Sequence, residues 1–138
     1  MPFTPYHFGP GLLIGLLFLS FIDFPTFLIA SVTIDIEPFL VLVFNLDYPL
    51  HGFFHSFLGG TIIALILTVI MTKVRKFFTP IMSFFKIEKE ISFKKILLAS
   101  LLGIYIHILF DSPIYPDIRP FFPLILILSI EVLIYLVY

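Results

Sequence analysis

An uninterrupted apolar run in the middle of the chain is the sequence feature that most limits the possible folds. Residues 52–72 contain no Asp, Glu, Lys or Arg, and His55 is the only ionisable side chain among them. A run of this length supplies the roughly 20 apolar residues that a helix needs to cross the hydrocarbon core of a bilayer. The whole chain has 138 residues, of which 60% are hydrophobic, and its mean hydropathy is +1.16. A soluble domain of this size has too little interior to bury so much apolar surface, so we predict an integral membrane protein.

Further apolar stretches on both sides of this run predict an all-α fold. We expect a polytopic membrane helix bundle of four or five short transmembrane helices, forming a single integral membrane domain over residues 1–138. The predicted helices cover residues 9–22, 25–44, 53–74, 93–112 and 120–138. The first is short enough to be a re-entrant half-helix instead of a span. Asp23-Phe24-Pro25 predicts a tight turn before the second helix.

One segment, residues 73–95, holds seven of the eight Lys and Arg residues. They are Lys73, Arg75, Lys76, Lys86, Lys89, Lys94 and Lys95. Short loops rich in Lys and Arg stay on the cytoplasmic side of a membrane. We therefore predict a multi-pass protein of the cell membrane with residues 73–95 as a basic cytoplasmic loop, the N-terminus outside and the C-terminus in the cytoplasm. Thr79-Pro80 is typical of a helix start, with Thr79 as the N-cap, and predicts a short interfacial helix over residues 80–87.

Composition excludes several classes of function. The charged fraction is 12% and the net charge is −1, so there is no basic surface for nucleic acid, and membrane lipid is the expected partner. The chain has no cysteine, which excludes disulfides, thiolate metal sites and Cys nucleophiles. No Ser-nucleophile motif and no phosphate-binding glycine loop are present.

The polar residues of the predicted spans gather at one level of the membrane. Alternation of the spans places all four histidines and three carboxylates at the outer face, opposite the basic loop. They are His7, Asp35, Glu37, His51, His55, His107 and Asp111. Charged side chains at the centre of a membrane helix cost roughly 2.5–3.5 kcal/mol each and usually mark a functional site. We therefore predict that these seven residues bind one or two metal ions.

Two pairs among them are spaced by four residues. His51 and His55 lie at the start of the third predicted helix, and helical backbone there would stack both rings on one face; His107 and Asp111 would do the same on helix 93–112. Two histidines so placed can bind one metal ion, and Asp111 can be a ligand or can orient an imidazole. The alternative for each pair is a hydrogen-bonded polar group in the protein core.

Asp35 and Glu37 precede Pro38, which disfavours helical backbone at the residue before it. We expect the helix to be unwound there, so that both carboxylates face one polar cavity. The alternative is a proline-kinked helix whose carboxylates lie near the interface.

Arg119 is the only basic residue outside the 73–95 loop, and it is a candidate for binding an anionic substrate group or, alternatively, a lipid headgroup.

The order and spacing of these residues resemble the membrane-bound metal-dependent hydrolase family (YdjM-like). The residues that carry the resemblance lie in four short stretches, Met1–His7, Ile34–Pro38, His51–Ser56 and His107–Asp111. The family pattern reads roughly His … Pro-Asp-x-Asp … His-Arg-Gly-x-Thr-His-Ser … His-x-x-x-Asp. In this chain Thr33-Ile34 replaces the Pro before the acidic pair, Glu37 replaces the second Asp, and the spacing from His51 to His55 is one residue shorter. The resemblance implies a metal site and suggests hydrolysis, but it names no substrate.

These observations favour a membrane-embedded metal-dependent hydrolase that acts on an amphipathic substrate, such as a lipid or lipid phosphate, near the outer face. Mixed His and carboxylate ligands suit zinc first, and manganese or iron next. A carboxylate that is not a ligand, Glu37 or Asp35, would be the general base. The main alternative is a subunit that transports metal ions or protons through the same cluster. A third hypothesis is a haem-binding electron carrier, against which the companion carboxylates argue.

Overall fold

The computed structural model describes residues 5–87 and 90–125, and in these residues the fold is helical with no strand. The elements are α1 (Pro5–Leu17), α2 (Phe24–Thr33), α3 (Ile36–Val43), η1 (Phe53–His55), α4 (Phe57–Val74), η2 (Arg75–Phe78), α5 (Thr79–Phe84) and α6 (Phe93–Asp111). The predicted all-α fold is confirmed. The helix predicted over residues 120–138 lies mostly outside the described residues.

Three stretches of the described chain are long and apolar enough to cross a membrane. They are Phe24–Val43 with 20 residues, Phe57–Phe84 with 28 and Phe93–Asp111 with 19, and a shorter apolar helix covers His7–Leu17. Large apolar side chains cover the outside of these helices, for example Leu13, Val69 and Leu109, which are 62%, 56% and 55% exposed. Such a surface suits lipid as the surrounding solvent, which confirms the helical membrane character that the sequence predicts.

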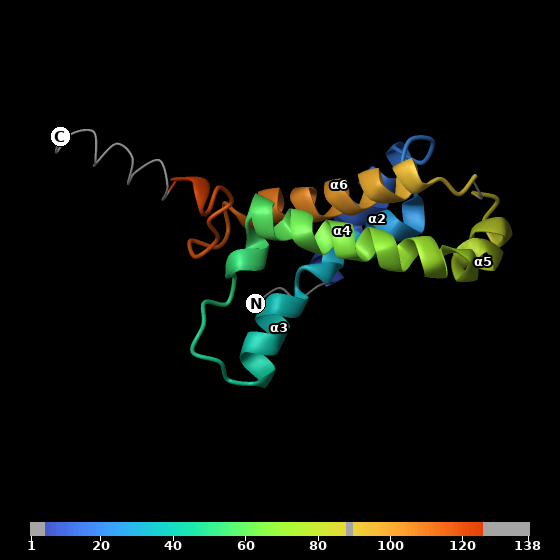
Figure 1. Ribbon diagram of the computed structural model, residues 1–138. Helices are drawn as coiled ribbons and strands as arrows, with labels where there is room; N and C mark the ends of the chain where they lie inside the picture. The colour runs from blue at the N-terminus through green and yellow to red at the C-terminus, as the bar shows by residue number, and fades with distance from the viewer. Residues whose placement is uncertain (1–4, 88–89, 126–138) are drawn as a thin grey trace, which may run out of the picture.

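Helices α2, α4 and α6 run side by side, and α1 packs against α2 (Figure 1). Small residues let these helices approach closely, as is common in membrane bundles. A Cβ atom on Gly103 of α6 would lie 2.5 Å from Cβ of Ala30 in α2, and one on Gly60 of α4 would lie 2.9 Å from Ile104 of α6. Helix α6 therefore lies close to both of its neighbours at these two glycines.

The helix predicted over residues 25–44 is two helices, α2 and α3, separated by a turn at residues 34–35. Pro38 has no N–H to donate to the carbonyl of Ile34, and a proline is tolerated only in the first turn of a helix. Pro38 is the third residue of α3, so the chain restarts its helix just before the proline. Helix α3 then bends away from the bundle (Figure 1), and Asp35 lies at the bend.

A buried ion pair fixes one end of the bundle. Asp23 is the N-cap of α2, where its Oδ2 accepts hydrogen bonds from the backbone N–H and the hydroxyl of Thr26 at 3.2 and 2.6 Å. Its Oδ1 accepts a bond from Nε of Arg75 at 2.6 Å, and its own N–H donates to the carbonyl of Lys95 at 3.3 Å. Arg75 is only 3% exposed, so this member of the basic segment is a structural residue that joins three elements.

The predicted interfacial helix corresponds to α5, whose last residue Phe84 and the following Phe85 are exposed. Thr79 was expected to be the N-cap, but this is wrong: Thr79 is the first residue of α5, and Phe78 precedes it without a capping side-chain bond. The reason is that η2 runs directly into α5. Thr79 consequently has helical backbone angles, φ −54° and ψ −46°, and cannot adopt the extended conformation of a side-chain cap.

Candidate metal centre

The ionisable residues of the membrane segments meet at the end of the bundle opposite the Asp23–Arg75 pair. Each comes from the end of an element: His7 from the start of α1, Asp35 from the α2–α3 turn, and His107 and Asp111 from the last turns of α6. His51 and His55 come from the segment that leads into α4. Six side chains far apart in the sequence therefore lie in two overlapping groups suited to a metal ion.

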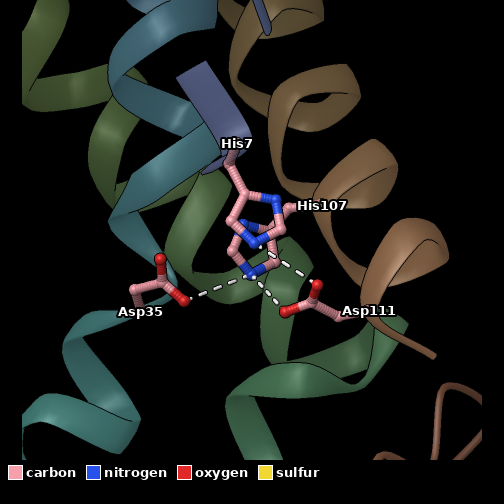
Figure 2. Close-up of side chains that lie close together, drawn as sticks. All are labelled: His7, Asp35, His107 and Asp111. Atoms are coloured by element: carbon pink, nitrogen blue, oxygen red, sulfur yellow. Dashed lines mark ion pairs between the residues drawn. The ribbon is translucent and has the colours of Figure 1, made fainter. Parts of the chain in front are cut away.

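The first group consists of His7, Asp35, His107 and Asp111, with one ligand atom from each within 4.8 Å of all the others (Figure 2). Nε2 of His7 lies 3.3 Å from Oδ1 of Asp111. Nε2 of His107 lies 3.4 Å from Oδ1 of Asp35 and 3.3 Å from Oδ2 of Asp111. Ligand atoms placed tetrahedrally at about 2.0–2.1 Å from one ion are about 3.3–3.4 Å apart. The three observed separations fit such a site.

The tautomer of His107 is fixed by its surroundings. Its Nδ1 lies 2.7 Å from the carbonyl oxygen of Ser31, and because a carbonyl only accepts, Nδ1 carries the proton. In a neutral ring Nε2 then presents a lone pair. That atom is buried without a hydrogen-bond partner, and it faces the carboxylates of Asp35 and Asp111 (Figure 2). Three acceptors directed at one another require a cation between them, either a metal ion or a proton on Nε2.

The second group consists of His51, His55 and Asp111, all buried. Nδ1 of His55 lies 2.7 Å from Oε2 of Glu37, whose other oxygen accepts the backbone N–H of Phe54 at 3.1 Å. The carboxylate thus accepts a hydrogen bond from Nδ1–H of His55, and Nε2 of His55 is a second buried ring nitrogen without a hydrogen-bond partner. A carboxylate that holds Nδ1 while Nε2 faces a metal is the usual support of a metal-binding histidine.

His51 is held in the same way from the loop that follows α6. Its Nδ1 lies 3.0 Å from Oδ2 of Asp117, and its backbone N–H donates to the same oxygen at 3.1 Å. Partial burial raises the pKa of Asp117, but the bonds from His51 outweigh it, so the pKa of this carboxyl lies below its ordinary value. Tyr115 covers the other side of the imidazole, with 4.4 Å between the ring centroids. Nδ1 is therefore occupied by an acceptor, which leaves Nε2 for the second group.

The sequence predicted the wrong backbone for His51 and His55. His51 lies in a bend outside any helix, and His55 lies in the short η1 helix. Ser56 is the reason: its backbone is extended with ψ 158°, and its Oγ accepts the N–H of Gly59 at 3.0 Å as the N-cap of α4. The α-helix begins only at Phe57, and a compact turn, not a helix face, brings the two rings to a centroid distance of 4.7 Å.

Two predicted site residues lie outside both groups. Glu37, predicted as a ligand or general base, has both oxygens engaged by Phe54 and His55. Arg119, predicted to bind substrate, is exposed and lines a cavity of about 330 Å³ together with His51 and Asp117. Sequence reasoning gave no role to Asp117 or to the Ser31 carbonyl. Neither is detectable by spacing, because they lie 66 and 76 residues from the histidines they hold.

Comparison with protein-family models, with curated proteins and with solved structures gives no match to this chain. The resemblance to the YdjM-like hydrolases therefore stays a prediction, and the argument for a function depends on the site itself.

Proposed function

We propose that the protein is a membrane-embedded metal-dependent hydrolase that acts on an amphipathic lipid or lipid-phosphate substrate. The observation that carries this proposal is the orientation of His107. Its Nδ1 is committed to the Ser31 carbonyl, and its buried Nε2 points at two carboxylates with no hydrogen bond of its own. Burying a ring nitrogen without a hydrogen-bond partner costs free energy in an apolar interior. An ion that normally binds this nitrogen would remove that cost.

The donor set of imidazoles and carboxylates suits zinc first, and manganese or iron next. Such an ion supplies Lewis acidity and lowers the pKa of a water molecule toward neutrality. Among the residues of the chain, His7, His107 and Asp111 hold the ion. Glu37 and Ser31 orient the imidazoles of His55 and His107.

Asp35 is the best candidate for the general base. Its side chain is 17% exposed, whereas that of Asp111 is 5% exposed, so Asp35 is the carboxylate of the first group that is better reached from outside. In the proposed reaction an oxygen of Asp35 accepts the proton of the attacking water. Glu37 is less suited to this role because protein donors already bind both of its oxygens.

The cavity beside His51 suggests where a substrate headgroup binds. It has a volume of about 330 Å³ and combines the Arg119 guanidinium with the aromatic rings of Tyr48, Phe53 and Phe122. An arginine binds phosphate oxygens through paired N–H donors, and the aromatic lining suits the apolar part of an amphiphile. The basic segment lies at the other end of the bundle, and the positive-inside rule therefore favours the outer face of the membrane for this cavity.

Metal analysis of the detergent-purified protein tests the proposal. We expect bound zinc, manganese or iron in the wild type and at least a tenfold loss of affinity in His107→Ala, because an outer partner alone is typically worth 10–100-fold. Lys76→Met, an exposed change at the opposite end, is the control for purification. Phosphate release from a panel of phospholipids and polyprenyl phosphates then tests hydrolysis. A wild type that binds no metal after supplementation contradicts the proposal.

Transport of metal ions or protons is the rival function. The described core between the site and the Asp23–Arg75 pair consists of apolar residues together with uncharged Thr68 and Ser100. The described residues therefore offer no ionisable side chain as a relay between the two ends, which favours an enzyme over a transporter. Ion uptake by proteoliposomes, lost in Asp35→Asn, would reverse this preference.

A further inference from the structure

We infer that the site binds two divalent metal ions and that Asp111 bridges them. The inference rests on the metal-binding part of the proposed function, and it assigns a second ion and a bridging role that neither the sequence pattern nor a single-ion site requires. Three independent observations support it: the sharing of Asp111, the number of unpartnered ring nitrogens, and the charge of the surrounding carboxylates.

Asp111 is the only residue that the two groups of the described chain have in common. One oxygen faces His7 at 3.3 Å and the other faces His107 at 3.3 Å, while the same carboxylate lies within 4.8 Å of ligand atoms of His51 and His55. Asp111 is 4% exposed. A buried carboxylate with candidate ligands on two sides has the position of a ligand that bridges two metal ions.

Each group also has its own unsatisfied nitrogen. Nε2 of His107 belongs to the first group and Nε2 of His55 to the second, and both atoms are buried without a hydrogen-bond partner. No group formed by the described residues contains both of these histidines. Two ligand atoms of one ion lie at most about 4.2 Å apart, twice the bond length. One ion satisfies one of these nitrogens, and a second ion satisfies the other.

The charge of the site also favours more than one divalent ion. Asp35 and Asp111 lie in the groups, and Glu37 and Asp117 accept the Nδ1–H bonds of His55 and His51. The Asp117 side chain is 37% exposed and lines the same cavity as Arg119, so the carboxylates that need a cation from the site are Asp35, Glu37 and Asp111. With neutral histidines, a single divalent ion would leave one of these negative charges uncompensated at membrane depth, which is unfavourable. Two-metal sites of this kind are typical of enzymes that cleave phosphate esters.

Manganese loading of the full-length purified protein tests the inference, because Mn²⁺ gives both a stoichiometry and a spin signal. We expect two Mn²⁺ per chain by elemental analysis and the electron paramagnetic resonance signal of an exchange-coupled pair. His51→Ala removes a ligand of the second group only and His7→Ala one of the first group only, so each variant should retain one ion with the signal of an isolated Mn²⁺. Asp111→Asn should abolish the coupled signal.

Asp47→Asn, the same carboxylate-to-amide change in an exposed loop, should keep both ions and the coupling. Circular dichroism and size-exclusion chromatography establish that each variant is folded before it is scored. One ion per chain in a saturated wild type, or two ions without coupling, overturns the inference. Hydrolysis by a one-ion wild type would leave the proposed function standing, whereas a wild type without metal would refute both.

Discussion

Three of the four histidines share one arrangement at the level of single residues. Each has its Nδ1 against an oxygen of the protein: Glu37 for His55, the Ser31 carbonyl for His107 and Asp117 for His51. An acceptor at Nδ1 fixes the tautomer, so that Nε2 is the unprotonated atom of the neutral ring. The arrangement prepares three ligands that need no proton transfer before an ion binds.

Glu37→Gln tests this arrangement. The amide can still accept a bond through its carbonyl, but its NH₂ group can instead donate to Nδ1 of His55, which moves the ring proton to Nε2 and blocks that ligand. The carboxylate charge that makes the imidazole a better ligand is lost as well. We expect metal affinity to fall about 10–100-fold, measured by competition with a chelator on purified protein.

Asp47→Asn provides the matched control, since it removes the same charge from an exposed position and should leave the affinity unchanged. If Glu37→Gln binds metal as tightly as the control, Glu37 does not position His55 for an ion.

The residue types of the site could be read from the sequence, but their roles could not. Histidines and carboxylates stand out in apolar segments because they are costly there, which is why His7, Asp35, His107 and Asp111 were all named. Which carboxylate can reach an ion and which only holds an imidazole depends on how segments far apart in the sequence pack together. Glu37 therefore looked like a base, and Asp117 had no assigned role.

At the level of elements, the contact between α2 and α6 sets the geometry of the first group. Ser31 and Asp35 follow one another along the end of α2, and His107 of α6 touches both. The close approach at Gly103 holds this contact: a Cβ there would lie 2.9 Å from the backbone oxygen of Phe27 and 3.1 Å from the backbone nitrogen of Ser31. Backbone atoms cannot move aside as a flexible side chain can.

Gly103→Ala should therefore lower stability and loosen the site together. Overpacking of this kind typically costs about 1–3 kcal/mol, and a displaced α6 would lengthen the bond from His107 to Ser31. We expect a lower midpoint of thermal unfolding in detergent and weaker metal binding. Gly9→Ala is the matched control, because a Cβ at Gly9 meets no atom within 4 Å. Equal unfolding midpoints for the two variants would contradict the proposed close contact.

The elements themselves were predictable to different degrees. The predicted range 93–112 agrees with α6 (Phe93–Asp111) within one residue, because a continuous apolar run is a strong local signal. Pro38 correctly indicated a broken helix, but the break lies at residues 34–35, and Glu37, which was expected to be unwound, is helical in α3. The turn at residues 51–56 was missed because its cause is the capping hydroxyl of Ser56, and a spacing of four residues is equally compatible with a helix and with a compact turn. Nothing local to Arg75 indicates that its partner is Asp23, which is 52 residues away.

The whole molecule is polarised along the bundle. The Asp23–Arg75 pair and Lys95 lie at one end, and the histidines with their carboxylates lie at the other. Because α2, α4 and α6 run between these ends (Figure 1), the orientation of the bundle decides which compartment the candidate site faces. The positive-inside rule favours the basic end in the cytoplasm.

Cysteine labelling in intact cells tests this orientation cleanly, because the chain has no cysteine of its own and a single introduced one is a unique reporter. Asp47 lies in the exposed loop that leads to His51, and Lys76 is exposed beside the buried Arg75 at the basic end. We expect a membrane-impermeant maleimide to label Asp47→Cys in intact cells, and to label Lys76→Cys only after the membrane is permeabilised. Since both side chains are exposed, a difference between them reports the membrane and not burial. The opposite pattern would place the site on the cytoplasmic side of the membrane. The basic segment would then lie outside, against the positive-inside rule, and the substrate would have to come from the inner leaflet.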